Sequence, residues 1–257
     1  MGKIASRTLK ILSKFSIDKP WLTAEELAKL NGMPLSSIYR FLDSLTRSGY
    51  LMKDAQTQKF SVGPEMFRLA RVAEAGLSFR RFAIPWVEKL HTETGKTIYL
   101  VARSGTSWIC LESRVRPGMG SRFVVRAGEI APIYAGCPGR ILLAGLSDVE
   151  VNSLLDEINI VKLTPYTITD RMQIMNELAD IKRRGYHLTQ QQYQLGAWGL
   201  GAPIFDSLGR TQAALVIAGV ISNEDKPQIA VLKKNLLEAT GNISKNLGYS
   251  PSDIKFG

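Results

Sequence analysis

The chain has little of what most secreted proteins and metalloenzymes are built with. Its 257 residues include two cysteines and two histidines. Cys110 and Cys137 are too few for a disulfide framework and lack the CxxC spacing of a metal site, so a reducing compartment is expected. No apolar run approaches the roughly eighteen residues of a membrane span, and the N-terminus has no signal-peptide core. We therefore expect a cytoplasmic protein with no metal, no cofactor and no membrane partner.

Sequence motifs of the common enzyme classes are also missing. The chain contains no HExxH, no G-x-S-x-G, no Walker A loop and no GxGxxG. His187 lies among hydroxyl and amide side chains, with no obvious carboxylate to orient it. The fragment Gly199-Leu200-Gly201 precedes a predicted strand, so we interpret it as a β-bulge rather than a phosphate-binding loop. An enzymatic function is not expected, and an activity without a recognisable motif stays open as an alternative.

Positive charge is concentrated at the N-terminal end. The formal net charge is +10, and residues 1–76 alone hold 12 Lys and Arg against 7 Asp and Glu. Half of the excess therefore lies on less than half of the length. A basic region favours a polyanionic partner, whereas Lys and Arg that only keep a surface hydrated are the simpler alternative. The motif within this region decides between the two.

Residues 23–50, TAEELAKLNGMPLSSIYRFLDSLTRSGY, have the pattern of two short helices joined by a tight turn. Thr23 begins a capping box at the start of the first helix. Asn31-Gly32 allows the turn, and Pro34 suits the first position of the second helix. Residues 50–62 then read as a β-hairpin with basic residues near its tip. The region is therefore predicted to be a winged helix-turn-helix that reads DNA.

Side chains off the core face of the second helix are the candidates for DNA contact. Arg40 can bond a guanine or a phosphate, and serine hydroxyls can bond phosphates or base edges. Tyr39 lies beside two apolar positions, so a half-buried core residue is its alternative. For the wing the alternative is a solvated hairpin, although Gln56 or Gln58 could enter a minor groove. The predicted DNA-binding residues are Thr23, Ser36, Ser37, Tyr39, Arg40, Lys53 and Lys59.

The rest of the chain predicts a linker helix and a larger α+β domain. Residues 64–78 read as an amphipathic linker helix, and a second helical pattern over 79–94 is interrupted at Pro85. Strand-like segments precede a block of helices, and further strands come before a closing helix. Strands on both sides of a helical block suggest an antiparallel sheet flanked by helices. We therefore predict two domains, residues 1–63 and 79–257, joined by the linker.

Several segments, in this order, resemble the IclR-type bacterial transcriptional regulators over essentially the whole chain. The shared landmarks are MPLSSIYRFL at 33–42, Gly49-Tyr50, GEIAPIYAGCPGRILLA at 128–144, IKRRGY at 181–186 and GAPIFDSLGR at 201–210. The resemblance implies a GAF/PAS-like effector-binding and oligomerisation domain in 79–257. It also implies dimers or dimers of dimers on pseudo-palindromic operator DNA, controlled by a small organic effector such as a carboxylic acid or an aromatic catabolite. Leu35 stands where the family usually has Lys, which removes one expected phosphate contact.

The predicted effector pocket begins at residues 134–139, just before a helix whose free backbone N–H groups can hold a carboxylate. Cys137 can line the pocket or be a small core residue, and Trp198 can stack on an aromatic ring or simply pack. Residues 189–192, Thr-Gln-Gln-Gln, form a neutral lining that suits an uncharged or anionic ligand. Cys137→Asp is then expected to exclude an acid ligand, with Cys137→Ser as control. The predicted effector-binding residues are Met119, Phe123, Gly136, Cys137, Gly139, Leu146, Thr189, Gln190, Trp198 and Gly199.

One other class of function remains open. A protein-interaction module could use the winged helix as a docking surface, but that function leaves the larger domain unexplained. Salt-sensitive binding to DNA distinguishes the two, because contacts to phosphates release counterions. The prediction is therefore a DNA-binding transcriptional regulator whose operator binding responds to a small organic effector.

Overall fold

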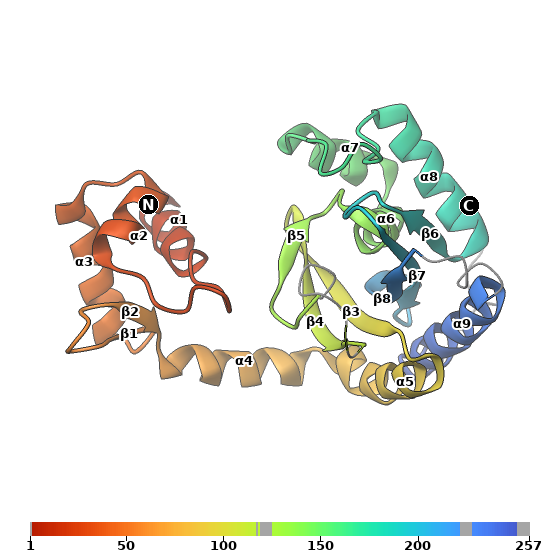
Figure 1. Cartoon of the computed structure of the whole chain (residues 1–257), viewed down its shortest axis with the longest axis horizontal. Helices are drawn as coiled ribbons and strands as arrows, with labels where there is room; N and C mark the ends of the chain where they lie inside the picture. The colour runs from red at the N-terminus through yellow and green to blue at the C-terminus, as the bar shows by residue number, and fades with distance from the viewer. Residues whose placement is uncertain (1, 117, 119–124, 222–227, 251–257) are drawn as a thin grey trace. The chain divides into compact units, whose positions relative to one another are not determined.

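The computed structural model describes residues 2–116, 118, 125–221 and 228–250 (Figure 1). Met119 and Phe123, two predicted walls of the effector pocket, lie outside the described residues. Backbone contacts divide the chain into two compact units, Met1–Leu77 and Ser78–Gly257. None of the described helices is long and apolar enough to cross a membrane.

The N-terminal unit is a winged helix-turn-helix followed by a helix. Its described elements are α1 (Gly2–Leu12), α2 (Ala24–Asn31), α3 (Leu35–Arg47), β1 (Leu51–Lys53), β2 (Phe60–Val62) and α4 (Pro64–Gly76). The small core combines Ile11 of α1, Leu27 of α2 and Leu42 of α3 with Leu51 and Phe60 of the hairpin. Strands β1 and β2 pair antiparallel and form the wing (Figure 1).

The turn between α2 and α3 follows from local sequence. Thr23 Oγ1 accepts the Glu26 N–H at 3.2 Å, and the Thr23 N–H donates to the Glu26 carboxylate at 2.8 Å, which is the predicted capping box. Gly32 takes the left-handed conformation at φ +60°, which a side chain would disfavour. Pro34 is the N-cap of α3 rather than its first helical residue, and α3 begins beside it, at Leu35.

The C-terminal unit is a six-stranded antiparallel sheet between helices. Its described elements are α5 (Ser78–Thr94), β3 (Thr97–Ser104), β4 (Ser107–Arg114), β5 (Ile130–Pro132), α6 (Gly136–Ala144), α7 (Asp148–Glu157), α8 (Arg171–Arg184), β6 (His187–Gln190), β7 (Ala197–Phe205), β8 (Thr211–Val220) and α9 (Ile229–Asn246). The strand order is β5-β4-β3-β8-β7-β6. Helices α5 and α9 pack on one face, whereas α6 packs on the other and separates the sheet from α8 (Figure 1). The predicted α+β class is confirmed.

Two predicted local features are wrong. Helix α5 runs through Pro85 without a break. Gly199 and Gly201 lie in regular register with β8, and the irregularity of β7 is at Ile204/Phe205 instead. The glycines are there because α6 comes close: a Cβ on Gly201 would lie 2.7 Å from Cys137 Sγ, and one on Gly199 would lie 3.2 Å from Cys137 Cβ. Glycine in a strand interior often marks such a close approach rather than a bulge.

Candidate functional site

The outer face of α3 carries the predicted DNA contacts. The Ile and Leu side chains of α3 are buried in the core, so Ser36 and Arg40 lie on the opposite, exposed side. Arg40 makes no hydrogen bond or ion pair with any described residue, and its guanidinium is free to reach DNA. Pro34 provides no side-chain cap. The Ser37 N–H donates to the Pro34 carbonyl at 3.0 Å, so the N–H groups of Leu35 and Ser36 are the ones available for a phosphate. Thr23 Oγ1 is occupied as a cap, so that residue keeps only its hydroxyl hydrogen as a donor.

A groove of about 410 Å³ lies between α1 and α3, with Ser37, Arg40 and Ser44 on one side. Arg7 and Thr8 of α1 line the other side, and sequence reasoning did not select them. The sequence does carry a signal for Arg7, because this basic residue interrupts the apolar positions of α1 within a helix of the DNA-binding unit. Tyr39 is 44 % exposed and does not belong to the core, so its ring is available at the surface. The α3 surface thus combines basic and hydroxyl groups, the side chains that contact phosphates and base edges.

The wing places two lysines at the surface but also an acid. Lys53 and Lys59 are both exposed. Asp54 Oδ1 accepts the backbone N–H of Thr57 at 2.6 Å and the Thr57 hydroxyl at 2.7 Å. These bonds, the backbone one first, lower the pKa of the Asp54 carboxyl. Gln58 has φ +58° and its amide donates to the carbonyl three residues earlier, so this side chain folds back on the wing.

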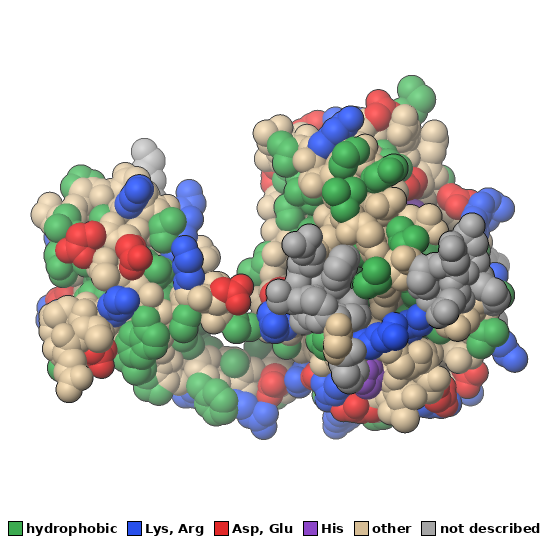
Figure 2. Space-filling view, viewed as in Figure 1, with side chains coloured by type: hydrophobic (Ala, Val, Ile, Leu, Met, Phe, Trp, Pro, Cys, Tyr) green, Lys and Arg blue, Asp and Glu red, His purple; other side chains and the backbone are tan. Residues whose placement is uncertain are grey.

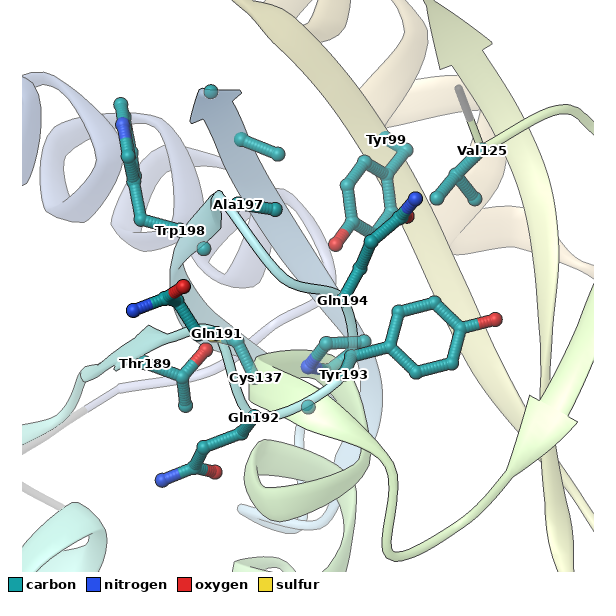
Figure 3. Close-up of a pocket in the computed structure, with 15 residues that line it drawn as sticks. Tyr99, Val125, Cys137, Thr189, Gln191, Gln192, Tyr193, Gln194, Ala197 and Trp198 are labelled. Atoms are coloured by element: carbon teal, nitrogen blue, oxygen red, sulfur yellow. The ribbon is translucent and has the colours of Figure 1, made fainter. Parts of the chain in front are cut away.

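In the C-terminal unit a small pocket lies between the start of α6, strands β6 to β8 and the loop of residues 191–194 (Figure 3). Its volume is about 50 Å³, which is room for a few water molecules. Ligand pockets in proteins usually enclose about 300–1,000 Å³. None of the described lining residues is charged: they are Tyr99, Val125, Gly136, Cys137, Pro138, Thr189, Gln191, Gln192, Tyr193, Gln194, Ala197, Trp198, Gly199, Ala218 and Gly219.

The structure brings only part of the predicted effector set to this pocket. Gly136, Cys137, Thr189, Trp198 and Gly199 border it. Leu146 borders a different cavity, of about 390 Å³, near the ends of α6 and α8. Gly139 is needed for packing, because a Cβ there would lie 1.9 Å from the Ile133 carbonyl oxygen. Tyr99 and Tyr193 line the pocket and were missed, since they come from β3 and from a loop that no motif marks.

The Trp198 ring points away from the pocket. Trp198 pairs with Gly219 across β7 and β8, and cross-strand partners share a face of the sheet. Gly219 follows Ala218, which packs into the core beneath α6, so Gly219 and Trp198 face the other side. There the ring centroid lies 5.8 Å from Lys96 Nζ. Gln190 pairs with Trp198 and shares that face. Both side chains therefore lie on the face of the sheet opposite α6, and Trp198 borders the pocket at its edge.

Cys137 is a buried packing residue at the start of α6. It is 2 % exposed, and its Sγ donates to the His187 carbonyl at 3.3 Å. Burial raises the pKa of its thiol, so the side chain stays a neutral thiol. Cys137→Asp would place a carboxylate in the core and cost folding free energy. The substitution therefore cannot isolate ligand exclusion, contrary to the expectation from sequence.

The contact between Cys137 and β7 makes a prediction about stability. We expect Gly201→Ala to lower the free energy of unfolding by about 1–3 kcal/mol, because the added methyl overpacks the core against Sγ. Calorimetric unfolding should show that Cys137→Ala restores most of this loss in the double variant. Gly241→Ala is the matched control, since nothing lies within 4 Å of a Cβ at that position. Additive losses in the double variant would contradict the proposed contact.

Hydrogen bonds fix the loop over the pocket. Thr164 Oγ1 donates to the Gln191 carbonyl at 2.6 Å, and Thr167 Oγ1 donates to the Gln192 carbonyl at 2.7 Å. Tyr193 packs directly on Gly136: a Cβ on this glycine would lie 2.9 Å from the Tyr193 Cβ. The first turn of α6 is therefore covered by the tyrosine, and movement of this loop would enlarge the pocket.

Behind the loop lies a polar cluster of three residues from three elements, of which Arg140 is buried and Glu177 and His187 are half-buried. Arg140, fully buried, donates through Nε to Glu177 Oε2 at 2.8 Å and through Nη2 to the Ile168 carbonyl at 2.9 Å. His187 Nε2 lies 3.8 Å from Glu177 Oε1, so the carboxylate that sequence inspection did not find comes from α8. Burial is the main cause that lowers the pKa of His187, with Glu177 opposing it.

Comparison with known proteins gives the following similarities. The family model "Bacterial transcriptional regulator IclR C-terminal" matches residues 74–245, and the model "IclR helix-turn-helix domain" matches residues 5–55. The HTH-type transcriptional regulator KipR of Bacillus subtilis is 27 % identical, over 97 % of this chain and 98 % of its own. An IclR transcriptional regulator from Alicyclobacillus acidocaldarius is 26 % identical with a TM-score of 0.78, over 95 % of this chain and 96 % of that one.

One similar structure contains a ligand. It is an IclR homologue from Microbacterium hydrocarbonoxydans complexed with 4-hydroxybenzoate, 23 % identical with a TM-score of 0.81, over 96 % of this chain and 100 % of that one. At this identity the similarity supports a shared fold. The named relatives are transcriptional regulators rather than enzymes.

Proposed function

Because this chain belongs to the IclR family of bacterial transcriptional regulators, we propose that it binds a pseudo-palindromic operator through α3 and the wing, and that a small organic effector controls this binding. The observation that carries the proposal is the exposed face of α3. It presents Arg40, which has no partner among the described residues, beside a helix N-terminus that has no side-chain cap. A surface that served only solubility would not need hydroxyl groups and a helix N-terminus at the same place.

A second copy of the chain supplies the second half-site. No residue of α4 is buried, although Met66, Leu69, Ala70 and Ala73 form one apolar stripe flanked by Val72. Leu69 is 38 % and Val72 59 % exposed, and Figure 2 shows hydrophobic side chains at the surface of α4. Contiguous exposed apolar surface marks an interaction site. We assign this stripe to a homodimer, which presents two α3 helices to a two-fold symmetric site.

The effector is proposed to be a small organic acid or an aromatic catabolite. Two observations support this class: the described pocket lining carries no charge, and the first turn of α6 offers backbone N–H groups to an anion. The complex of a similar protein with 4-hydroxybenzoate also supports an aromatic acid. Since the pocket holds only about 50 Å³, binding requires Tyr193 to leave the first turn of α6.

Footprinting of DNA upstream of the gene tests the proposed function. We expect symmetric protection of two half-sites, with affinity that falls steeply as salt rises because phosphate contacts release counterions. A thermal-shift screen of organic acids, 4-hydroxybenzoate included, then identifies compounds that change the footprint; a ligand at a hundred times its Kd stabilises the folded state by about 2.7 kcal/mol. Protection of one unsymmetrical half-site by a monomer would overturn the dimeric proposal. Absence of salt-sensitive DNA binding would favour a protein-interaction module.

A further inference from the structure

A single carboxylate oxygen lies between the loop over the pocket and a half-buried histidine. Gln192 Nε2 donates to Glu177 Oε1 at 3.2 Å. His187 Nε2 lies 3.8 Å from the same oxygen. The other oxygen of Glu177 is engaged by Arg140. Both Gln192 and His187 can therefore reach Oε1. A charged donor from His187 would draw on the negative charge of this oxygen and weaken its bond to the neutral amide of Gln192.

His187 does not use that oxygen in the present arrangement. Its Nε2 is buried and has no hydrogen-bond partner among the described residues. A neutral imidazole with its hydrogen on the other nitrogen has only a lone pair at Nε2, and protonation turns this acceptor into a donor. A buried polar atom without a partner calls for an explanation, and a second protonation state provides one.

The charges around His187 come from two helices. Glu177, Asp180 and Arg184 act on it from α8, and Arg140 acts on it from α6. On the side of β7 it pairs with Gly201, which carries no charge. The pKa of His187 is lowered first by burial, so the ring is neutral near neutral pH and takes up its proton only as the solution becomes acidic.

We propose that His187 is a proton-operated latch on the loop that covers the effector pocket. On acidification Nε2 gains a hydrogen and donates it to Glu177 Oε1, which weakens the bond of Gln192 to this oxygen and loosens the loop, so that the Tyr193 side chain can leave the first turn of α6. The assignment of this pocket to the effector rests on the proposed function, whereas the latch operates without a ligand. Thr164 and Thr167 still bind the carbonyls of Gln191 and Gln192 at the start of the loop. The backbone movement is therefore confined to the residues that follow Gln192.

The latch also has a consequence for ligand binding. The closed pocket has a volume of about 50 Å³, too small for an aromatic acid, and release of Tyr193 provides the missing space. A ligand that binds only when the loop is released raises the proton affinity of His187. By thermodynamic linkage, protonation of His187 raises the affinity for that ligand by the same factor. An effector of this pocket therefore binds more tightly at acidic than at neutral pH.

Hydrogen exchange of the full-length protein tests the latch without any effector. Mass spectrometry follows peptides over residues 188–198, where the Gly196 N–H donates to Gln191 Oε1 at 3.1 Å and the Ala197 N–H donates to the Gln194 carbonyl at 3.2 Å. After correction for intrinsic exchange, we expect about fivefold faster exchange at about pH 5 than at about pH 7.5, the equivalent of one hydrogen bond lost. His187→Gln should abolish this difference. His91→Gln, at the chain's other histidine, should preserve it.

A second variant keeps the test decisive if His187→Gln does not fold. Gln192→Leu removes the bond to Glu177 and should exchange rapidly at both pH values, with no pH dependence of its own. Equal exchange of the parent protein at the two pH values would overturn the latch, as would a pH dependence that survives in His187→Gln or Gln192→Leu. Failure of operator binding would instead refute the proposed function and leave the exchange result unaffected.

Discussion

Arg40→Ala is expected to lower operator affinity by about 5- to 150-fold, the loss typical of a side chain that contacts a base edge. The fold should be unaffected, because Arg40 is exposed on α3 and has no partner among the described residues. Fluorescence anisotropy with operator and scrambled DNA of the same length measures the effect. Preference for the operator should fall together with affinity, since a contact to a base edge discriminates between sequences.

Two control variants sharpen this test. Lys59→Ala, on the wing, should weaken operator and scrambled DNA about equally, because a lysine near the backbone contacts phosphates that every sequence shares. Arg71→Ala, whose guanidinium pairs with Glu74 on α4, should change neither. An Arg40→Ala protein that keeps full operator affinity and preference would show that α3, or its register on DNA, is wrongly assigned.

Leu69→Glu combined with Val72→Glu is expected to convert the protein into monomers and to weaken operator binding by at least about 100-fold. A monomer reads one half-site, so much of the binding free energy of a specific complex is lost. Both side chains are exposed, Leu69 within the apolar stripe of α4 and Val72 beside it, so the substitutions should not disturb either core. Sedimentation velocity gives the oligomeric state, and anisotropy gives the affinity.

The polar side of α4 offers the matched control. Arg71→Glu changes charge on the same helix without touching the apolar stripe, and it should leave the dimer in place. If the doubly substituted protein remains dimeric with full operator affinity, the α4 stripe is not the dimer contact. If it becomes monomeric and still binds the operator as tightly, a symmetric dimer is not needed for recognition.

The helix-turn-helix could be predicted because its determinants are local. The capping pair Thr23 and Glu26 is separated by three residues, and Gly32 adopts its left-handed conformation within one turn. The apolar residues of α3 recur at helical spacing and are buried together. Interactions over three or four residues are visible in a sequence, because the geometry of the helix already specifies which side chains meet.

The pocket was only partly predictable, because strand register decides which side chains enter it. Alternation places Thr189 and Trp198 on opposite faces of the sheet, and no local signal states which face meets α6. From the sequence, Gly199 and Gly201 of β7 were interpreted as a β-bulge. The structure shows that they accommodate Cys137, a residue more than sixty positions earlier in the chain.

The sequence alone determined the α+β class, the winged helix-turn-helix, the order of strands and helices, and the resemblance to a regulator family. All of these follow from periodicity and from motifs of adjacent residues. Only the tertiary structure decided that Arg140, Glu177 and His187 form one polar cluster beside Gln192. These side chains come from α6, α8, β6 and a loop, and their approach depends on helix packing against a sheet, which residues distant in sequence jointly specify.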